Sequence, residues 1–156
     1  QETIQELASH INRAKKVALF VGAGIEGAHD EVVSLAEKAA APVGHSLRGK
    51  DFIQYDNPLD VGMTGLLGYG AAAEGIHDAD LMIMIGTDFP YDQFLPETTT
   101  IQIDTDPSVM GRRTDVDLQI EGSALETLRA LLPLVEYKKD RKWLDRVLKK
   151  HDQIMN

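Results

Sequence analysis

The chain has 156 residues, a formal net charge of −9, 43% hydrophobic residues and no cysteine. This length and composition fit one folded domain with its own core and argue against disorder. The acidic balance disfavours nucleic acid as a partner, and the absence of cysteine excludes disulfides, thiolate zinc sites and cysteine nucleophiles.

The first half of the chain predicts two helix and strand pairs. An amphipathic helix is expected over residues 1–16, followed by a short apolar strand over 17–21. A second helix is expected over 29–41, with acidic residues in its first turn and an end set by Pro42. A second strand is expected over 42–46. No signal-peptide pattern opens the chain, and no apolar run is long enough to span a bilayer.

The second half begins with a change of pattern. Turn residues replace any long period between residues 47 and 67, which indicates a functional loop, and a small-residue helix is expected over 69–79. Strands are expected over 80–86, 99–104 and 116–122. Ser123 and Glu126 have the capping-box spacing at the start of a predicted helix over 123–132, and a last helix is expected over 140–155.

Helices therefore alternate with strands that are continuously apolar. This combination predicts an α/β fold, a Rossmann-like parallel sheet of five to six strands with helices on both faces. We expect one nucleotide-binding domain over 1–156, excised from a longer enzyme, in which residues 138–156 lead toward the next domain. Ligands of such sheets bind beyond the carboxyl ends of the strands.

A glycine-rich turn follows the first predicted strand. Gly22, Ala23 and Gly24, with Gly27, give the spacing G-x-G-x-x-G. Such glycines let a phosphate approach the backbone and the next helix N-terminus. A tight turn without a ligand is the alternative. The stretch APVGHSLRGK, where a ribose-binding acid is expected, contains no Asp or Glu.

Asp104 offers that acid at the end of a different strand. Its carboxylate can accept hydrogen bonds from both ribose hydroxyls, although an Asp that caps the turn DTDPS is the alternative. The loop GMTGLLGYG, residues 62–70, places Met63 and Leu66 among glycines, which suits contact with a flat aromatic ring. A flexible surface loop is the alternative there. The five histidines are scattered, and no metal site is expected.

Three stretches carry a family resemblance. Residues 47–70 (LRGKDFIQYDNPLDVGMTGLLGYG), 83–94 (IMIGTDFPYDQF) and 101–107 (IQIDTDP) resemble the central domain of the pyruvate oxidase and pyruvate:quinone dehydrogenase group of thiamine-diphosphate enzymes. The resemblance implies three α/β domains. The outer two bind thiamine diphosphate and Mg²⁺, and the central one binds FAD, through which electrons pass from pyruvate to oxygen or a quinone as acetate and CO₂ form.

The resemblance also assigns roles. Residues 63–66 would lie along the flavin, 86–90 at the pyrophosphate and ribityl chain, and Asp104 at the adenosine. The implied cofactor-binding residues are Gly22, Ala23, Gly24, Ser46, Leu47, Met63, Thr64, Gly65, Leu66, Gly86, Thr87, Asp88, Phe89, Pro90 and Asp104. No catalytic residue and no metal ligand are expected on this chain, so the enzyme activity belongs to the full-length protein.

The expected partners are FAD, the two thiamine-diphosphate-binding domains of the same polypeptide, and further copies in a homotetramer. The expected location is the cytoplasm, peripheral to the inner face of the membrane in the full-length enzyme. One alternative is a structural spacer domain without a nucleotide, favoured by Asp88 and Ser123, which replace an Arg and an Asp frequent in flavin-binding relatives. Another is an NAD-binding domain resembling sirtuins, from GAGIEGA, or transhydrogenases, from GYGAAAE.

Overall fold

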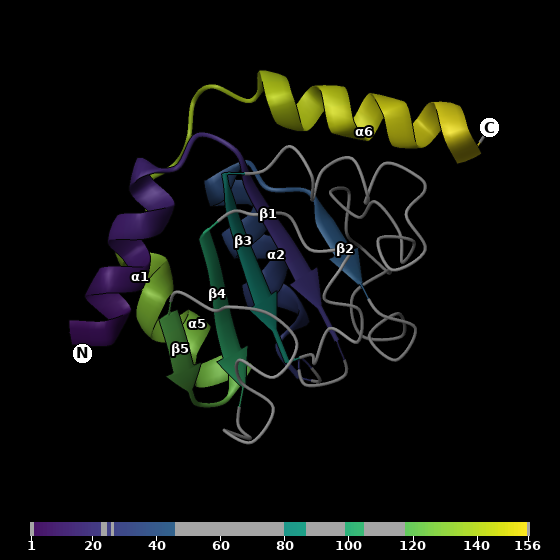
Figure 1. Ribbon diagram of the computed structural model, residues 1–156. Coiled ribbons are helices and arrows are strands. Elements are labelled where there is room, and N and C mark those ends of the chain that lie inside the picture. Colours follow the sequence, from purple (N-terminus) through teal and green to yellow (C-terminus); the bar gives the residue numbers. More distant parts are fainter. Residues whose placement is uncertain are drawn as a thin grey trace.

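A parallel β-sheet forms the centre of the molecule. The computed structural model describes residues 2–22, 25, 27–45, 80–86, 99–104 and 118–155 (Figure 1). The elements within them are α1 (Glu2–Arg13), β1 (Val17–Val21), α2 (His29–Ala39), β2 (Val43–His45), β3 (Leu81–Ile85), β4 (Thr99–Asp104), β5 (Leu118–Glu121), α5 (Ala124–Leu131), the 3-10 turn η5 (Leu132–Leu134) and α6 (Lys142–Met155).

The five described strands are all parallel and lie in the order β2-β1-β3-β4-β5. The predicted α/β fold with a parallel sheet is therefore confirmed. The strand order reverses between β1 and β3, so this pair forms the topological switch point at which open α/β sheets bind ligands. The predicted loop over 47–67 and helix over 69–79 lie outside the described residues.

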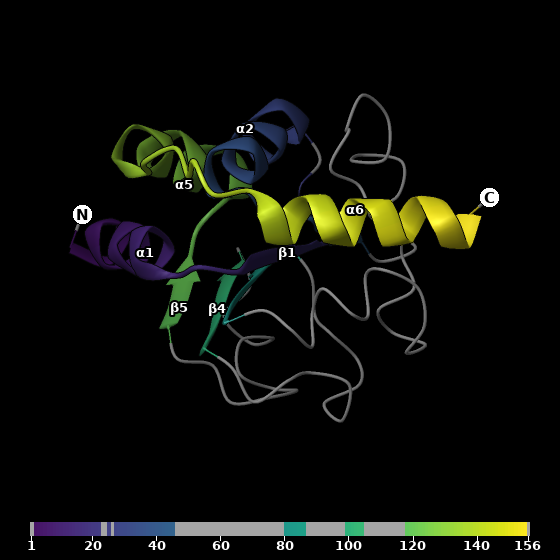
Figure 2. The same ribbon diagram turned by 90° about the horizontal axis from the view of Figure 1, so that it is seen from above.

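Both faces of the central strands are buried, which explains why these strands are continuously apolar in the sequence. One face joins the main hydrophobic core through Leu19, Ile83 and Ile101, each at most 1% exposed. On the other face Phe20 and Met82 are equally buried. Figure 2 shows α2 and α5 on one side of the sheet, and α1 packs against α5. The prediction that helices cover both faces of the sheet stays a prediction.

The helices end where hydrogen bonds to other groups replace helical ones. The prediction that the first helix extends to residue 16 is wrong: α1 ends at Arg13, and the Asp80 carboxylate accepts hydrogen bonds from the backbone N–H groups of Lys15 and Lys16, at 3.1 and 3.0 Å. α2 ends at Ala39, and Ala40 turns the chain with a φ of 53°. The last helix begins at Lys142 rather than at 140.

The segment over residues 132–141, which we call the strap, joins α5 to α6 at the end of the sheet where the strands begin. Asn12 donates to the carbonyl of Leu134 at 3.1 Å and accepts from the N–H of Glu136 at 2.9 Å. Arg141 donates to the carbonyl of Glu37 in α2 at 2.8 Å. α6 then runs across this end of the molecule (Figure 1). None of the described helices combines the length and apolarity of a membrane-spanning segment.

Candidate functional site

The carboxyl edge of the sheet, where the strands end, brings together residues from four strands. Gly22 follows β1, Gly86 follows β3, Asp104 ends β4 and Gly122 follows β5. Each glycine extends the ladder by one bond: the N–H of Gly22 donates to Ile85, that of Gly86 to Ile103 and that of Gly122 to Asp104, at 3.1, 2.9 and 2.8 Å between the nitrogen and oxygen atoms. The four strand ends therefore lie side by side.

This arrangement confirms that three of the predicted cofactor-binding positions, Gly22, Gly86 and Asp104, share one edge. Gly22 and Gly86 flank the switch point between β1 and β3. Gly86 has a φ of 64°, in the left-handed region that glycine adopts without strain. The N–H groups of both glycines are bound by strand carbonyls and are therefore not available to a phosphate.

The turn from β1 into α2 is built around a buried side chain. The N–H of Ile25 donates to the carbonyl of Gly22, the N–H of Ala28 donates to that of Ile25, and the side chain of Ile25 is fully buried. The N-cap residue of α2, Ala28, makes no side-chain hydrogen bond to the first turn. The N-terminal turn of a helix favours an anion in general, whereas Asp30 in the first turn of α2 opposes one.

The β4 and β5 side of the edge is acidic. Asp104 is half-buried and pairs in register with Glu121, an exposed residue that ends β5. Neighbouring carboxylates accept hydrogen bonds from hydroxyls and repel phosphates. The edge thus divides into a glycine side suited to phosphate and an acidic side suited to a sugar. Glu121 was not among the predicted site residues, although IEG ends a predicted strand as ID does at Asp104.

Ser123 has a structural role in the described part of the chain. Its hydroxyl oxygen accepts a hydrogen bond from the N–H of Glu126 at 3.1 Å, so it caps α5 as the spacing predicts. The remaining predicted cofactor-binding residues lie outside the described residues: Ala23, Gly24, Ser46, Leu47, Met63, Thr64, Gly65, Leu66, Thr87, Asp88, Phe89 and Pro90.

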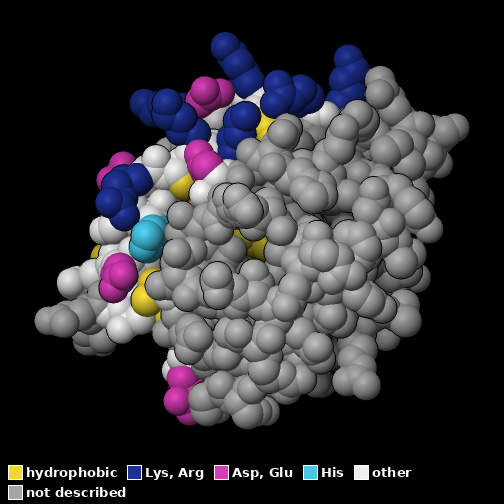
Figure 3. Space-filling view, in the orientation of Figure 1, with side chains coloured by type: hydrophobic (Ala, Val, Ile, Leu, Met, Phe, Trp, Pro, Cys, Tyr) yellow, Lys and Arg dark blue, Asp and Glu magenta, His cyan; other side chains and the backbone are white. Residues whose placement is uncertain are grey.

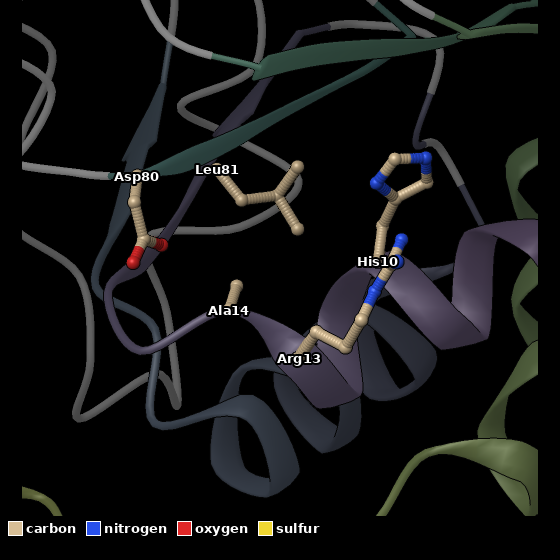
Figure 4. A pocket seen from close by; sticks show the side chains of 5 residues that line it. All are labelled: His10, Arg13, Ala14, Asp80 and Leu81. Atoms are coloured by element: carbon tan, nitrogen blue, oxygen red, sulfur yellow. The ribbon is translucent and has the colours of Figure 1, made fainter.

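A shallow depression of about 280 Å³ lies at the opposite end of the sheet, between the end of α1 and the start of β3 (Figure 4). His10 and Arg13 line it from α1, and Asp80 and Leu81 from the β3 end. The Asp80 carboxylate is already bound by two backbone N–H groups, and Arg13 donates to the carbonyl of Ser9. The side chains of Asp80 and Arg13 are therefore engaged within the fold. Within the described ranges no three acidic, His or Cys residues cluster as a metal site.

Comparisons with known proteins agree on a family. A family model described as "Thiamine pyrophosphate enzyme, central domain" matches residues 4–131. An uncharacterized 42.6 kDa protein of Pseudomonas amyloderamosa is 44% identical over 93% of this chain and 37% of its own length. The acetolactate synthase isozyme 1 large subunit of Escherichia coli is 31% identical over 92% of this chain and 26% of its own length.

Among solved structures, a benzoylformate decarboxylase from Polynucleobacter necessarius matches with a TM-score of 0.74 and 26% identity, over 90% of this chain and 28% of that chain. The chain thus spans between a quarter and two fifths of the length of these three matched proteins.

Proposed function

The chain belongs to the central-domain family of the thiamine pyrophosphate enzymes, and from this membership we propose that it binds FAD in an enzyme that oxidises pyruvate to acetate and CO₂. In this proposal the two other domains of the full-length protein hold thiamine pyrophosphate and Mg²⁺. The domain described above positions the flavin, which accepts electrons and passes them to oxygen or a quinone.

The observation that carries the proposal is that Gly22 and Gly86 flank the switch point of the sheet and Asp104 ends the next strand along the same edge. FAD carries a pyrophosphate between two sugar-like chains, so it needs a phosphate-tolerant turn beside an acceptor for hydroxyls. The glycine side of the carboxyl edge and the Asp104 side supply these two features in adjacent strands. In the proposed complex Asp104 orients the ribose, and the first turn of α2 offers N–H groups to the pyrophosphate.

The proposal is tested by titrating the full-length protein with FAD, followed by the visible absorbance and fluorescence of the flavin. Asp104→Ala should weaken FAD binding by about 1–3 kcal/mol, the scale of hydrogen bonds to a charged acceptor. The matched control is Asp145→Ala, which removes the same charge from the exposed face of α6 at the other end of the sheet and should leave the affinity unchanged.

Unchanged affinity in Asp104→Ala would contradict the assignment of this residue. Absence of FAD binding in the parent protein would favour the spacer domain, and thermal stabilisation by NAD but not by FAD would favour the NAD-binding alternatives.

The similarity to an acetolactate synthase favours a second candidate, in which the chain is the central domain of an enzyme that forms acetolactate. An assay of the full-length protein on pyruvate separates the two. Acetolactate formed without net electron transfer supports the second candidate, whereas pyruvate-dependent reduction of an electron acceptor supports the first. Both candidate functions assign the same fold to the chain, so the FAD titration does not depend on which product the pyruvate assay shows.

A further inference from the structure

Helix α2 connects the two ends of the sheet. It begins at His29, shortly after the turn that follows β1 at the carboxyl edge, and it ends at Ala39, where the strap crosses the amino end. The 11 residues of α2 span about 16 Å, at a rise of about 1.5 Å per residue. Figure 2 shows α2 beside α5 on one side of the sheet. A contact at one end of α2 can therefore act on the other end.

The strap supplies hydrogen-bond donors to the last turn of α2. The guanidinium of Arg141 donates to the carbonyl of Glu37 at 2.8 Å. The backbone N–H of Lys138 donates to the carbonyl of Lys38, also at 2.8 Å, and the Lys38 ammonium donates in return to the carbonyl of Leu132 at 2.9 Å. The last four carbonyls of a helix have no partner within it, so the strap completes hydrogen bonding that α2 does not provide for itself.

Arg141 is held in place for this contact. Its side chain is 20% exposed, its Nη2 atom lies 3.4 Å from Oε2 of Glu37, and its guanidinium carbon lies 4.8 Å from the centre of the Tyr137 ring. Figure 3 shows Lys and Arg side chains gathered at this end of the molecule. Because the helix dipole favours a positive charge near the C-terminus of a helix, Arg141 stabilises the last turn of α2 by its charge as well as by its hydrogen bond.

The first turn of α2 is joined to the carboxyl edge by backbone hydrogen bonds. The N–H of Val32 donates to the carbonyl of Ala28 at 3.0 Å, and the N–H of Ala28 donates to that of Ile25 at 2.8 Å. The N–H of Ile25 then donates to the carbonyl of Gly22 at 3.2 Å. These bonds run without a break from α2 to the end of β1, so the position of α2 sets the position of the turn.

We propose that Arg141 is a positioning residue for the FAD site, from the opposite end of the sheet. Arg141 holds the last turn of α2, and α2 in turn fixes the turn between Gly22 and Ala28 at the carboxyl edge. The inference rests on the proposed function, which assigns FAD to that edge. An anion at the N-terminus of α2 and a cation at its C-terminus favour the same helical arrangement, so each contact strengthens the other.

The first test is an FAD titration of the full-length protein and its variants. Arg141→Met removes the donor to the Glu37 carbonyl and keeps an apolar stem, and it should weaken FAD binding by about threefold to tenfold. Arg141→Lys keeps an ammonium donor, so its affinity should fall between those of the parent and Arg141→Met. Arg146→Met is the matched control, since the Arg146 side chain is exposed on α6 and makes no hydrogen bond or ion pair with a described residue.

A second control separates positioning from a general loss of stability. Asn12 binds the same strap, through Leu134 and Glu136, but it belongs to α1 rather than to α2. Asn12→Ala should therefore destabilise the protein and leave FAD affinity unchanged. A purely structural role of Arg141 would give the same result in Arg141→Met as in Asn12→Ala.

Hydrogen–deuterium exchange without FAD gives a readout that needs no ligand. The amides of residues 32–35 report on the first turn of α2, where the N–H of Val32 binds the carbonyl of Ala28. Arg141→Met should speed exchange at these amides severalfold, because the cap that it removes supports the helix along its length. Asn12→Ala and Arg146→Met should leave the exchange unchanged.

Equal FAD affinity in the parent and in Arg141→Met, or an equally large loss in Asn12→Ala, would overturn the inference and leave the proposed function intact. A parent protein that binds no FAD would instead contradict the proposed function, and the exchange at residues 32–35 alone would then decide whether Arg141 positions this edge. Faster exchange confined to residues 37–40 would overturn that action along α2. If circular dichroism shows that Arg141→Met does not fold, Arg141→Lys is judged by the same outcomes.

Discussion

The two ends of the sheet are built in different ways. At the amino end, side chains bridge elements distant in the sequence: Asn12 and Lys138 join α1 to the strap, and Arg141 joins the strap to α2. At the carboxyl edge, backbone hydrogen bonds at Gly22, Gly86 and Gly122 align the strand ends. The difference teaches that side chains tie together distant elements at one end, whereas backbone hydrogen bonds alone align the strand ends at the other.

The largest expected effect follows from removing the bridge at Asn12. Asn12→Ala deletes two hydrogen bonds, to groups 122 and 124 residues away, and should lower the free energy of unfolding by about 1–3 kcal/mol. Urea unfolding followed by circular dichroism measures this loss, and FAD affinity should not change. Gln5→Ala is the control: Gln5 is exposed on α1 and its side chain makes no hydrogen bond with a described residue, so its loss should stay within about 0.5 kcal/mol. An equal effect on ligand affinity would break the division between the two ends.

A smaller effect is expected at Gly86, on the carboxyl edge. Because Gly86 has a φ of 64°, Gly86→Ala should cost about 1–2 kcal/mol of stability, the penalty of a side chain in the left-handed region. Gly86→Asn should cost less, since Asn tolerates this conformation better than Ala does. Unlike Asn12→Ala, the Ala variant should also weaken FAD binding, which a parallel titration measures. Stability equal to that of the parent protein in Gly86→Ala would contradict the strained geometry.

Removing the hydroxyl of Ser123 should lower the free energy of unfolding by about 1 kcal/mol and leave FAD affinity unchanged. Ser123→Ala removes the acceptor for the N–H of Glu126 and should lower the midpoint of urea unfolding accordingly. Ser123→Asp keeps an acceptor and adds a negative charge at the helix N-terminus, so it should retain the parent stability. Flavin-binding relatives frequently have Asp at this position, and the spacer interpretation holds that Ser123 weakens FAD binding. A higher FAD affinity in Ser123→Asp would support that interpretation. Unchanged affinity would leave Ser123 as a helix cap alone.

The sequence predicted the sheet well because its strands are short, apolar and sharply bounded. Residues 17–21 and 99–104 form strands with the predicted limits, and Ser123 caps α5 because its partner Glu126 is three residues away. The shared edge of Gly22, Gly86 and Asp104 was predictable because the parallel-sheet rule depends only on where strands end. Local patterns carry this information without any knowledge of tertiary contacts.

The amino end of the sheet was not predictable in the same way. α1 ends three residues before the predicted limit because its following N–H groups bind Asp80, more than 60 residues along the chain. The contacts of the strap with α1 and α2 were not predicted, since its partners Asn12 and Glu37 are over 100 residues away. Glu121 was left out of the site because only the register of β4 with β5 places it beside Asp104.

The smallest expected effect concerns the pH dependence contributed by Lys138. Its ammonium donates to the carbonyl of Ala14 at 2.7 Å, and burial lowers its pKa below the ordinary value of 10.5, against the attraction of the carboxylates of Asp80 and Glu136. Between the lowered pKa and 10.5 the unfolded chain binds more protons at this site than the folded chain does. The stability contribution of Lys138 should therefore rise with pH across that window.

Lys138→Met removes this contribution, so the parent and the variant are compared at each pH. The difference in the free energy of unfolding, parent minus variant, should shift in favour of the parent as the pH rises from neutral toward 10.5. Lys139→Met is the matched control, since the Lys139 side chain is exposed beside it and makes no hydrogen bond or ion pair with a described residue. Its difference curve should stay flat. A shift in the opposite direction for Lys138→Met would mean that the two carboxylates outweigh burial in setting the pKa of Lys138. The amino end would then be stabilised chiefly by charge rather than by hydrogen bonds to helix ends.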